Sequence, residues 1–101
     1  MHTIIHGLPM LPDGHDGYEW HVAGLSVTAR DVGGQWIVWI SDVDLAARTH
    51  VSAHAIDSDA GAALCEALVR FVGAASPILG ERVVRAIVAA QVAHAETEVA
   101  A

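Results

Sequence analysis

Three stretches of the chain alternate hydrophobic and polar residues with a period of two, which is the pattern of a β-strand with one buried face. They cover about residues 18–31, 35–41 and 49–56. A shorter apolar run at about residues 2–6 adds a further short strand. Because the stretch 49–56 is rich in alanine, a helix stays open as the alternative there. The pattern predicts an antiparallel sheet of three to four strands.

Glycine and proline positions indicate how these strands are connected. Residues 9–17 contain two prolines and two glycines and are predicted to form a loop. Gly24 is expected to bend the strand 18–31. The pair Gly33-Gly34 separates two alternating runs and predicts a two-residue hairpin turn, since both central positions of such a turn can require a positive φ.

The predicted hairpin determines which side chains share a face of the sheet. It pairs Thr28 with Trp39 and Arg30 with Ile37, so these four residues lie on one face. The other face then collects the apolar residues expected in the core, namely Val27, Ala29, Trp36, Val38 and Ile40.

The C-terminal part of the chain carries helical signals. After a connector at 41–48, the acids Asp57 and Asp59 provide N-cap chemistry for a helix over about 58–73. Ser76-Pro77 opens a second helix over about 77–96, which is apolar around most of its girth and should contact two partners. We predict a single α+β domain, residues 1–101, with the antiparallel sheet packed on one face by the two C-terminal helices.

The composition indicates an apolar surface that needs a partner. Hydrophobic residues make up 53% of the 101 residues and charged residues only 17%. So small a domain then has little polar cover for its surface. We therefore expect part of the apolar surface to be buried against a second molecule.

The charge balance opposes nucleic-acid binding. Twelve acidic residues face five basic ones, all of them Arg, for a formal net charge of −7. Phosphate binding depends on cations, so a nucleic-acid-related binding protein is the less favoured alternative. An acidic DNA mimic suits the sign better, although the acids are scattered. The absence of Lys and Asn is typical of a GC-rich genome, so we expect a GC-rich bacterium or its phage as the source.

No stretch of the sequence has the length and hydropathy of a membrane span. The most apolar one, 83–95, is too short and contains Arg85, Gln91 and His94. The first twelve residues lack the basic and apolar regions of a signal peptide. Cys65 is the single cysteine, which excludes an intrachain disulfide. We expect a cytoplasmic protein without membrane contact.

Seven histidines make a metal site the main chemical alternative. His2 and His6 stand four residues apart, as do His50 and His54, which suits one metal ion on a helix but spans about 13 Å in a strand. His21 shares the sheet face opposite the predicted core with His50 and His54, where neighbouring strands approach closely. A small histidine-liganded metal-binding protein is therefore a second alternative, and the sequence leaves open whether these three converge.

The remaining polar groups have structural explanations. Asp13 and Asp16 lie in the predicted loop without the spacing of a calcium-binding loop. Asp42 and Asp44 form an acidic pair in the connector, and Cys65 is expected to be a buried thiol. No serine stands in a G-x-S-x-G elbow. We predict no catalytic residue, no cofactor and no metal ligand, and hence no enzyme.

Two apolar regions outside the predicted core carry the interface prediction. An aromatic residue beside an aliphatic one on a nominally solvent-facing sheet is typical of interface hot spots, and the last helix supplies a second region. The candidate contacts are Thr28, Arg30, Ile37, Trp39, Val84, Val88 and Val92. The leading hypothesis is a small non-enzymatic protein-interaction module that self-associates as a homodimer and binds a protein partner.

Overall fold

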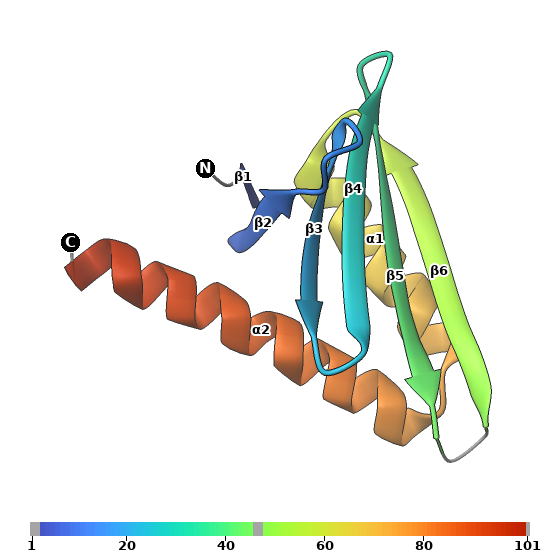
Figure 1. Ribbon diagram of the computed structural model, residues 1–101. Helices are drawn as coiled ribbons and strands as arrows, with labels where there is room; N and C mark the ends of the chain where they lie inside the picture. Colours follow the sequence, from blue (N-terminus) through green and yellow to red (C-terminus); the bar gives the residue numbers. More distant parts are fainter. Residues whose placement is uncertain (1–2, 46–47, 101) are drawn as a thin grey trace.

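The computed structural model describes residues 3–45 and 48–100 and shows an α+β fold, an antiparallel sheet packed with two C-terminal helices (Figure 1). The sheet order is β1-β2-β3-β4-β5-β6, each strand antiparallel to the next. The described residues form β1 (Thr3–Ile5), β2 (Leu8–Pro12), β3 (Gly17–Val22), β4 (Leu25–Val32), β5 (Gln35–Asp44), β6 (Thr49–Asp57), α1 (Ala60–Ala74) and α2 (Pro77–Ala100). The predicted class is confirmed, but the sheet has six strands rather than three or four.

The additional strands arise where the sequence indicated a bent strand and a loop. The segment 18–31 is not one strand but the β3–β4 hairpin. Residues 8–12 form β2 although they include Pro9 and Pro12. β2 pairs with β1 over residues 8–10 and with β3 over residues 11–12 only. Proline has no backbone N–H to donate. Pro9 and Pro12 therefore each interrupt the hydrogen bonding of one short strand pair and not that of a long central one.

Three hairpin turns share one two-residue geometry. His6-Gly7, Ala23-Gly24 and Gly33-Gly34 each join paired strands, and each has a positive φ at both positions. Such turns match the right-handed twist of the strands they connect. Only the Gly33-Gly34 turn was predicted. The other two were missed because a left-handed conformation is unfavourable for His and Ala, so these residues give no turn signal.

The strain at Ala23 gives a stability prediction. Its φ of 47° is a left-handed conformation that costs an L-residue roughly 1 kcal/mol. We expect Ala23→Gly or Ala23→Asn to raise the free energy of unfolding by about 0.5 to 1 kcal/mol in urea denaturation. Ala62→Gly, at an exposed position of α1, serves as the matched control and should lower it by roughly 0.5 kcal/mol. If Ala23→Gly lowered the free energy of unfolding as Ala62→Gly does, the assignment of strain to Ala23 would be contradicted.

The predicted register of the Gly33-Gly34 hairpin is confirmed. Thr28 pairs with Trp39, and Arg30 pairs with Ile37. Residues 41–44, predicted as a connector, instead extend β5 to Asp44. Residues 49–57 pair with β5 along their whole length, so 49–56 is a strand and not a helix. The predicted strand 2–6 is shorter as β1, and its first residue lies outside the described part of the chain.

Both helices begin at the caps that the sequence indicates. The Asp59 carboxylate accepts a hydrogen bond of 2.9 Å from the backbone N–H of Ala62, and Ser76 Oγ accepts one of 3.3 Å from that of Leu79. α1 begins two residues after the predicted position 58, and α2 continues past residue 96 to Ala100.

The two helices cover one face of the sheet and leave the other open (Figure 1). α1 packs on β5 and β6, and α2 packs on β2 and α1. Trp20 and Trp36 pack against the core, on the face predicted for them. The largest fully buried side chains are those of Leu8, Met10, Val27, Val38, Ile40, Leu64, Phe71, Leu79, Val83 and Ile87.

Two buried aspartates attach the beginning of α2 to β5. Asp42 is 4% exposed, and its Oδ2 lies 3.1 Å from a guanidinium nitrogen of Arg82. Asp44, also buried, accepts a hydrogen bond of 3.3 Å from the backbone N–H of Ser76. Because a buried carboxylate without a partner is strongly destabilising, these two contacts fix the position of the start of α2 relative to β5.

Candidate interaction surfaces

The candidate interface residues fall on two separate surfaces. One group lies on the open face of β4 and β5, and the other lies on α2, which packs on the opposite face of the sheet. The first group is Thr28, Arg30, Ile37 and Trp39, and the second is Val84, Val88 and Val92. The fold therefore offers two contact regions and not one combined interface.

The open face of the sheet carries a cross-strand row centred on Trp39. Thr28 is its neighbour on β4 and His54 is its neighbour on β6. In the adjacent row Ile37 pairs with Ile56, which is 53% exposed, while Ile37 and Trp39 are half-buried. We call Thr28, Ile37, Trp39, His54 and Ile56 the sheet surface.

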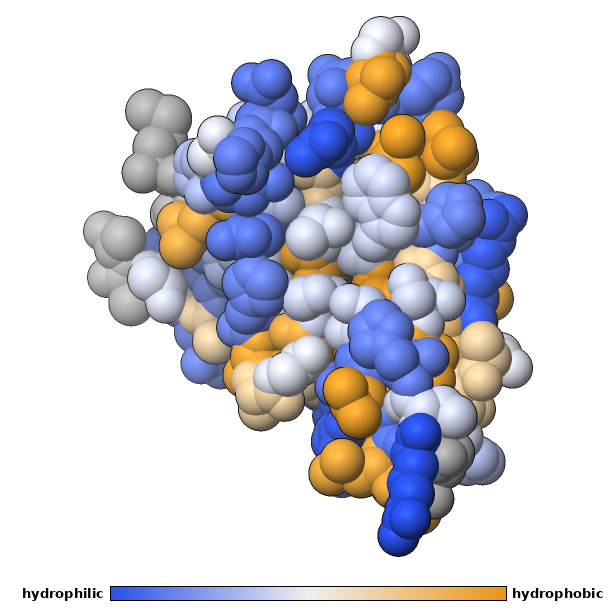
Figure 2. All heavy atoms as spheres, turned by 45° about the vertical axis from the view of Figure 1, so that its right-hand side comes forward, coloured by the Kyte–Doolittle hydropathy of each residue, from blue (hydrophilic) through white to orange (hydrophobic). Residues whose placement is uncertain are grey.

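Polar groups border the sheet surface. Figure 2, in which the β6 side is turned forward, shows residues of mostly intermediate hydropathy toward the middle, with both hydrophobic and strongly hydrophilic residues around them. Arg30 lies 3.9 Å from the Asp13 carboxylate, and the hydroxyls of Ser26 and Ser41 are hydrogen-bonded at 2.9 Å. An apolar centre with a polar rim is the usual composition of a protein interface.

Ile56 was missing from the predicted interface. Residues 49–56 could also be interpreted as a helix, and in a helix the position of Ile56 relative to β5 would not be determined. Pairing of β6 with β5 places Ile56 directly opposite Ile37 and doubles the aliphatic side chains beside Trp39. The period-two alternation of 49–56 was the signal that could have identified it.

The three histidines considered for a metal site do not converge. His50 and His54 lie four residues apart on β6, about 13 Å along the strand, and His21 lies on β3 with β4 and β5 between. His21 Nε2 instead lies 3.1 Å from Glu19 Oε2. Among the described residues, no group of three or more His, Cys, Asp or Glu could hold a metal ion. His2 is outside the described residues.

Asp13 has the structural role that was predicted for it. Its Oδ1 accepts hydrogen bonds from the backbone N–H groups of His15, at 2.6 Å, and Gly17, at 3.1 Å. The hydrogen bond from His15 is the main cause that holds the pKa of the Asp13 carboxyl below its usual value. Desolvation opposes it, and the hydrogen bond from Gly17 and the charge of Arg30 lower the pKa by smaller amounts. These bonds close the loop between β2 and β3.

Cys65 is exposed on α1, which corrects the expectation of a buried thiol. α1 turns Ala63, Leu64 and Ala67 toward the sheet, and position 65 falls on the other side of the helix. Cys65 follows Leu64 in the sequence, but the helical pattern alone does not determine which residues lie at the centre of the buried face of α1.

A small cavity lies where the β3–β4 turn meets α2. It has a volume of about 120 Å³ and its wall is mostly apolar, apart from the Asp42–Arg82 ion pair. The charged groups in the wall are already paired with each other. The cavity is therefore explained by the attachment of α2 and offers no separate catalytic arrangement.

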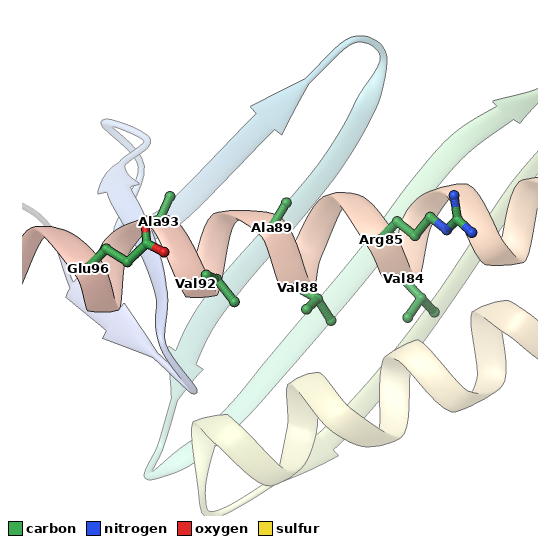
Figure 3. A pocket seen from close by; sticks show the side chains of 7 residues that line it. All are labelled: Val84, Arg85, Val88, Ala89, Val92, Ala93 and Glu96. Carbon is green, nitrogen blue, oxygen red and sulfur yellow. The ribbon is translucent and has the colours of Figure 1, made fainter.

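A larger and more open groove of about 550 Å³ runs along the solvent-facing side of α2 (Figure 3). In Figure 3, Val84, Val88 and Val92 form one edge, Ala89 and Ala93 form the other, and Arg85 and Glu96 lie toward the two ends. Val88 and Val92 are 46% and 49% exposed. We call this region, lined by Val84, Arg85, Val88, Ala89, Val92, Ala93 and Glu96, the α2 groove.

Comparison with protein-family models, with curated proteins and with solved structures finds no match for this chain. In the described part of the chain, neither helix combines the length and hydrophobicity required to cross a membrane.

Proposed function

We propose that this chain is a small cytoplasmic, non-enzymatic protein-interaction module that forms a homodimer and binds a protein partner through the sheet surface. The observation that supports the proposal most directly is the open face of the sheet. It holds a tryptophan with two isoleucines in the adjacent cross-strand row, and no element of the described chain packs over them. A protein partner would remove these side chains from water.

Trp39 is suited to be the main contact. A tryptophan at the centre of an interface, surrounded by residues that exclude water, contributes more than 2 kcal/mol in many complexes. Trp39 is half-buried, with Thr28 and His54 as its cross-strand neighbours, and a tryptophan has only two side-chain torsions to order on binding. Ile37 and Ile56 extend the apolar contact on one side.

The arginines favour a protein partner over a nucleic acid. Arg30, Arg70, Arg82 and Arg85 each lie within 4 Å of a carboxylate oxygen of the same chain. Their charges are thus already balanced locally, in a chain with a net charge of −7. Phosphate binding requires cations that can replace the counterions of the nucleic acid, and these arginines are poorly placed for that role.

Substitution of Trp39 tests this proposal. We expect Trp39→Ser to weaken binding of the protein partner at least about thirtyfold, because the central aromatic contact is lost. The tagged chain and its variants would be used to capture proteins from a lysate of the source organism, followed by titration of the purified partner. Val43→Ser is the matched control, since Val43 is 45% exposed on the same face but lies four positions from Trp39 on β5.

Two outcomes would count against the proposal. One is equal retention of the captured protein by wild type and Trp39→Ser, with Val43→Ser unchanged as well. The other is retention of nuclease-sensitive material in place of a protein. Circular dichroism and urea denaturation of each variant would show that loss of binding does not come from loss of the fold.

A further inference from the structure

The α2 groove carries opposite charges at its two ends. Arg85 lies at one end and Glu96 at the other, eleven residues apart on the same helix. The midpoint between them falls between positions 90 and 91. If a second α2 helix lies antiparallel across this midpoint, Arg85 of each copy faces Glu96 of the other.

The same arrangement brings the apolar edges of the two helices together. A two-fold axis keeps each edge on its own side, so the valine edge of one α2 lies beside the valine edge of the other, and the alanine edge beside the alanine edge. We propose that two copies of this chain associate through the α2 groove as an antiparallel, two-fold symmetric pair of α2 helices.

This inference rests on the homodimer in the proposed function and identifies its contact. A two-fold dimer uses the same patch on both copies, so the patch must be complementary to itself. The α2 groove meets this requirement in charge, and its valine edge supplies an apolar contact with the valine edge of the second copy. A parallel pair would place Arg85 against Arg85 and Glu96 against Glu96, which removes the charge complementarity.

The rows along the helix suit close packing. Val84, Val88 and Val92 stand four apart and form a ridge, while Ala89 and Ala93 form a shallow row beside it. Ridges of one helix pack into the spaces between ridges of another at interaxial distances of about 8 to 10 Å. The small alanines on the other edge allow the close end of that range.

The charged groups at the groove ends are available for the contact. Within the described residues Glu96 has no ion pair, and the Arg85 guanidinium is paired with Glu81 on the exposed side of the same helix at 2.7 Å. The side chains of Arg85 and Glu81 are 79% and 62% exposed. Arginine has five N–H donors and can contact a second carboxylate without leaving the first.

The size of the contact sets the expected affinity. One helix pair is at the low end of specific interfaces, so we expect a dissociation constant in the micromolar range. Sedimentation equilibrium over a wide concentration range should show a monomer–dimer equilibrium. A strict monomer at several hundred micromolar would overturn the proposal.

Val88→Glu tests the apolar part of the contact. The substitution places two carboxylates in the centre of the dimer, one from each copy, and should weaken dimerisation at least about a hundredfold. Ile78→Glu is the matched control, because Ile78 is 75% exposed on the same helix but lies outside the α2 groove. It should leave the dimerisation constant within about twofold. Equal effects of the two variants, or no effect of Val88→Glu, would contradict the proposal.

Charge reversal tests the antiparallel orientation. Arg85→Glu and Glu96→Arg should each weaken the homodimer about tenfold, since each creates two like-charge contacts. An equimolar mixture of the two single variants should form a heterodimer of near wild-type affinity, because both contacts again join opposite charges. Glu81→Ala controls for the intrahelical ion pair and should leave dimerisation unchanged. A mixture that associates no better than the separate variants would overturn the orientation.

The two proposals fail in different ways. Trp39→Ser alters the sheet surface on the opposite side of the molecule and should dimerise like the wild type. Val88→Glu should still bind the protein partner as a monomer. If Trp39→Ser kept full partner binding while Val88→Glu lost the dimer, only the role of the sheet surface would be contradicted. If Val88→Glu kept the dimer while Trp39→Ser lost partner binding, only the role of the α2 groove would be contradicted.

Discussion

Replacing Phe71 with alanine is expected to lower the free energy of unfolding by about 4 kcal/mol. Phe71 is completely buried on α1, the helix that packs on β5 and β6. Truncation to alanine loses the burial of the ring and leaves a cavity that the surrounding strands can fill only in part. A domain of this size has a total stability of about 5 to 15 kcal/mol, so this one change removes between roughly a quarter and four fifths of it.

Urea denaturation followed by circular dichroism measures this loss. Val69→Ala on the same helix is the control, since Val69 is 72% exposed and its truncation should change stability by less than about 0.5 kcal/mol. If Phe71→Ala does not fold, Phe71→Leu keeps the prediction measurable, with an expected loss of about 1.5 kcal/mol. A loss below 1 kcal/mol on truncation to alanine, with Val69→Ala unchanged, would show that Phe71 is not packed as described.

Replacing Arg82 with leucine should lower stability by about 3 kcal/mol, because it leaves the buried Asp42 carboxylate without its cation. Half of the Arg82 side chain is exposed, which places the expected loss at the lower end of the range for buried pairs. The backbone N–H of Val43 still donates to Asp42 at 2.7 Å but does not neutralise its charge.

A second substitution separates the loss of the ion pair from a general loss of packing. In the double variant Asp42→Asn, Arg82→Leu, no buried charge remains, so most of the lost stability should return. Glu81→Gln breaks the exposed Glu81–Arg85 pair and serves as a control, with an expected change below about 0.5 kcal/mol. If the double variant were no more stable than Arg82→Leu, the buried charge would not be the cause.

The proposed dimer has a consequence for partner binding. Because the α2 groove and the sheet surface lie on opposite sides of the chain, pairing through α2 leaves both sheet surfaces exposed. Such a dimer presents two equivalent binding sites. A partner with two copies of the recognised surface would then bind with higher apparent affinity than a single contact provides.

Sequence patterns predicted the central hairpin because its signals are local and agree with each other. Two glycines mark the turn at 33–34, and alternation on both sides allows one register that keeps the apolar residues together. That register located Thr28, Arg30, Ile37 and Trp39 on one face, as the structure shows. The two helices were predicted for a similar reason, since their caps lie next to apolar residues at helical spacing.

Other elements depend on interactions between distant residues, and local signals misled the prediction there. Ala23 accepts an unfavourable φ because the pairing of β3 with β4 outweighs a cost of roughly 1 kcal/mol. Asp42 and Asp44 interrupt the apolar alternation of β5 and so resemble a connector. They belong to the strand because Arg82 and Ser76, more than thirty residues later, provide their partners.

The sequence by itself determined the class of the fold, the register of the central hairpin and the presence of apolar residues beyond those of the core. These follow from periodicity, turn chemistry and composition, which act over short stretches of chain. Only the tertiary structure decided that the candidate contacts form two surfaces on opposite sides, that Cys65 is exposed, and that His21, His50 and His54 stay apart. Those properties depend on how strands and helices pack, and packing brings together or separates residues whose spacing along the chain carries no such information.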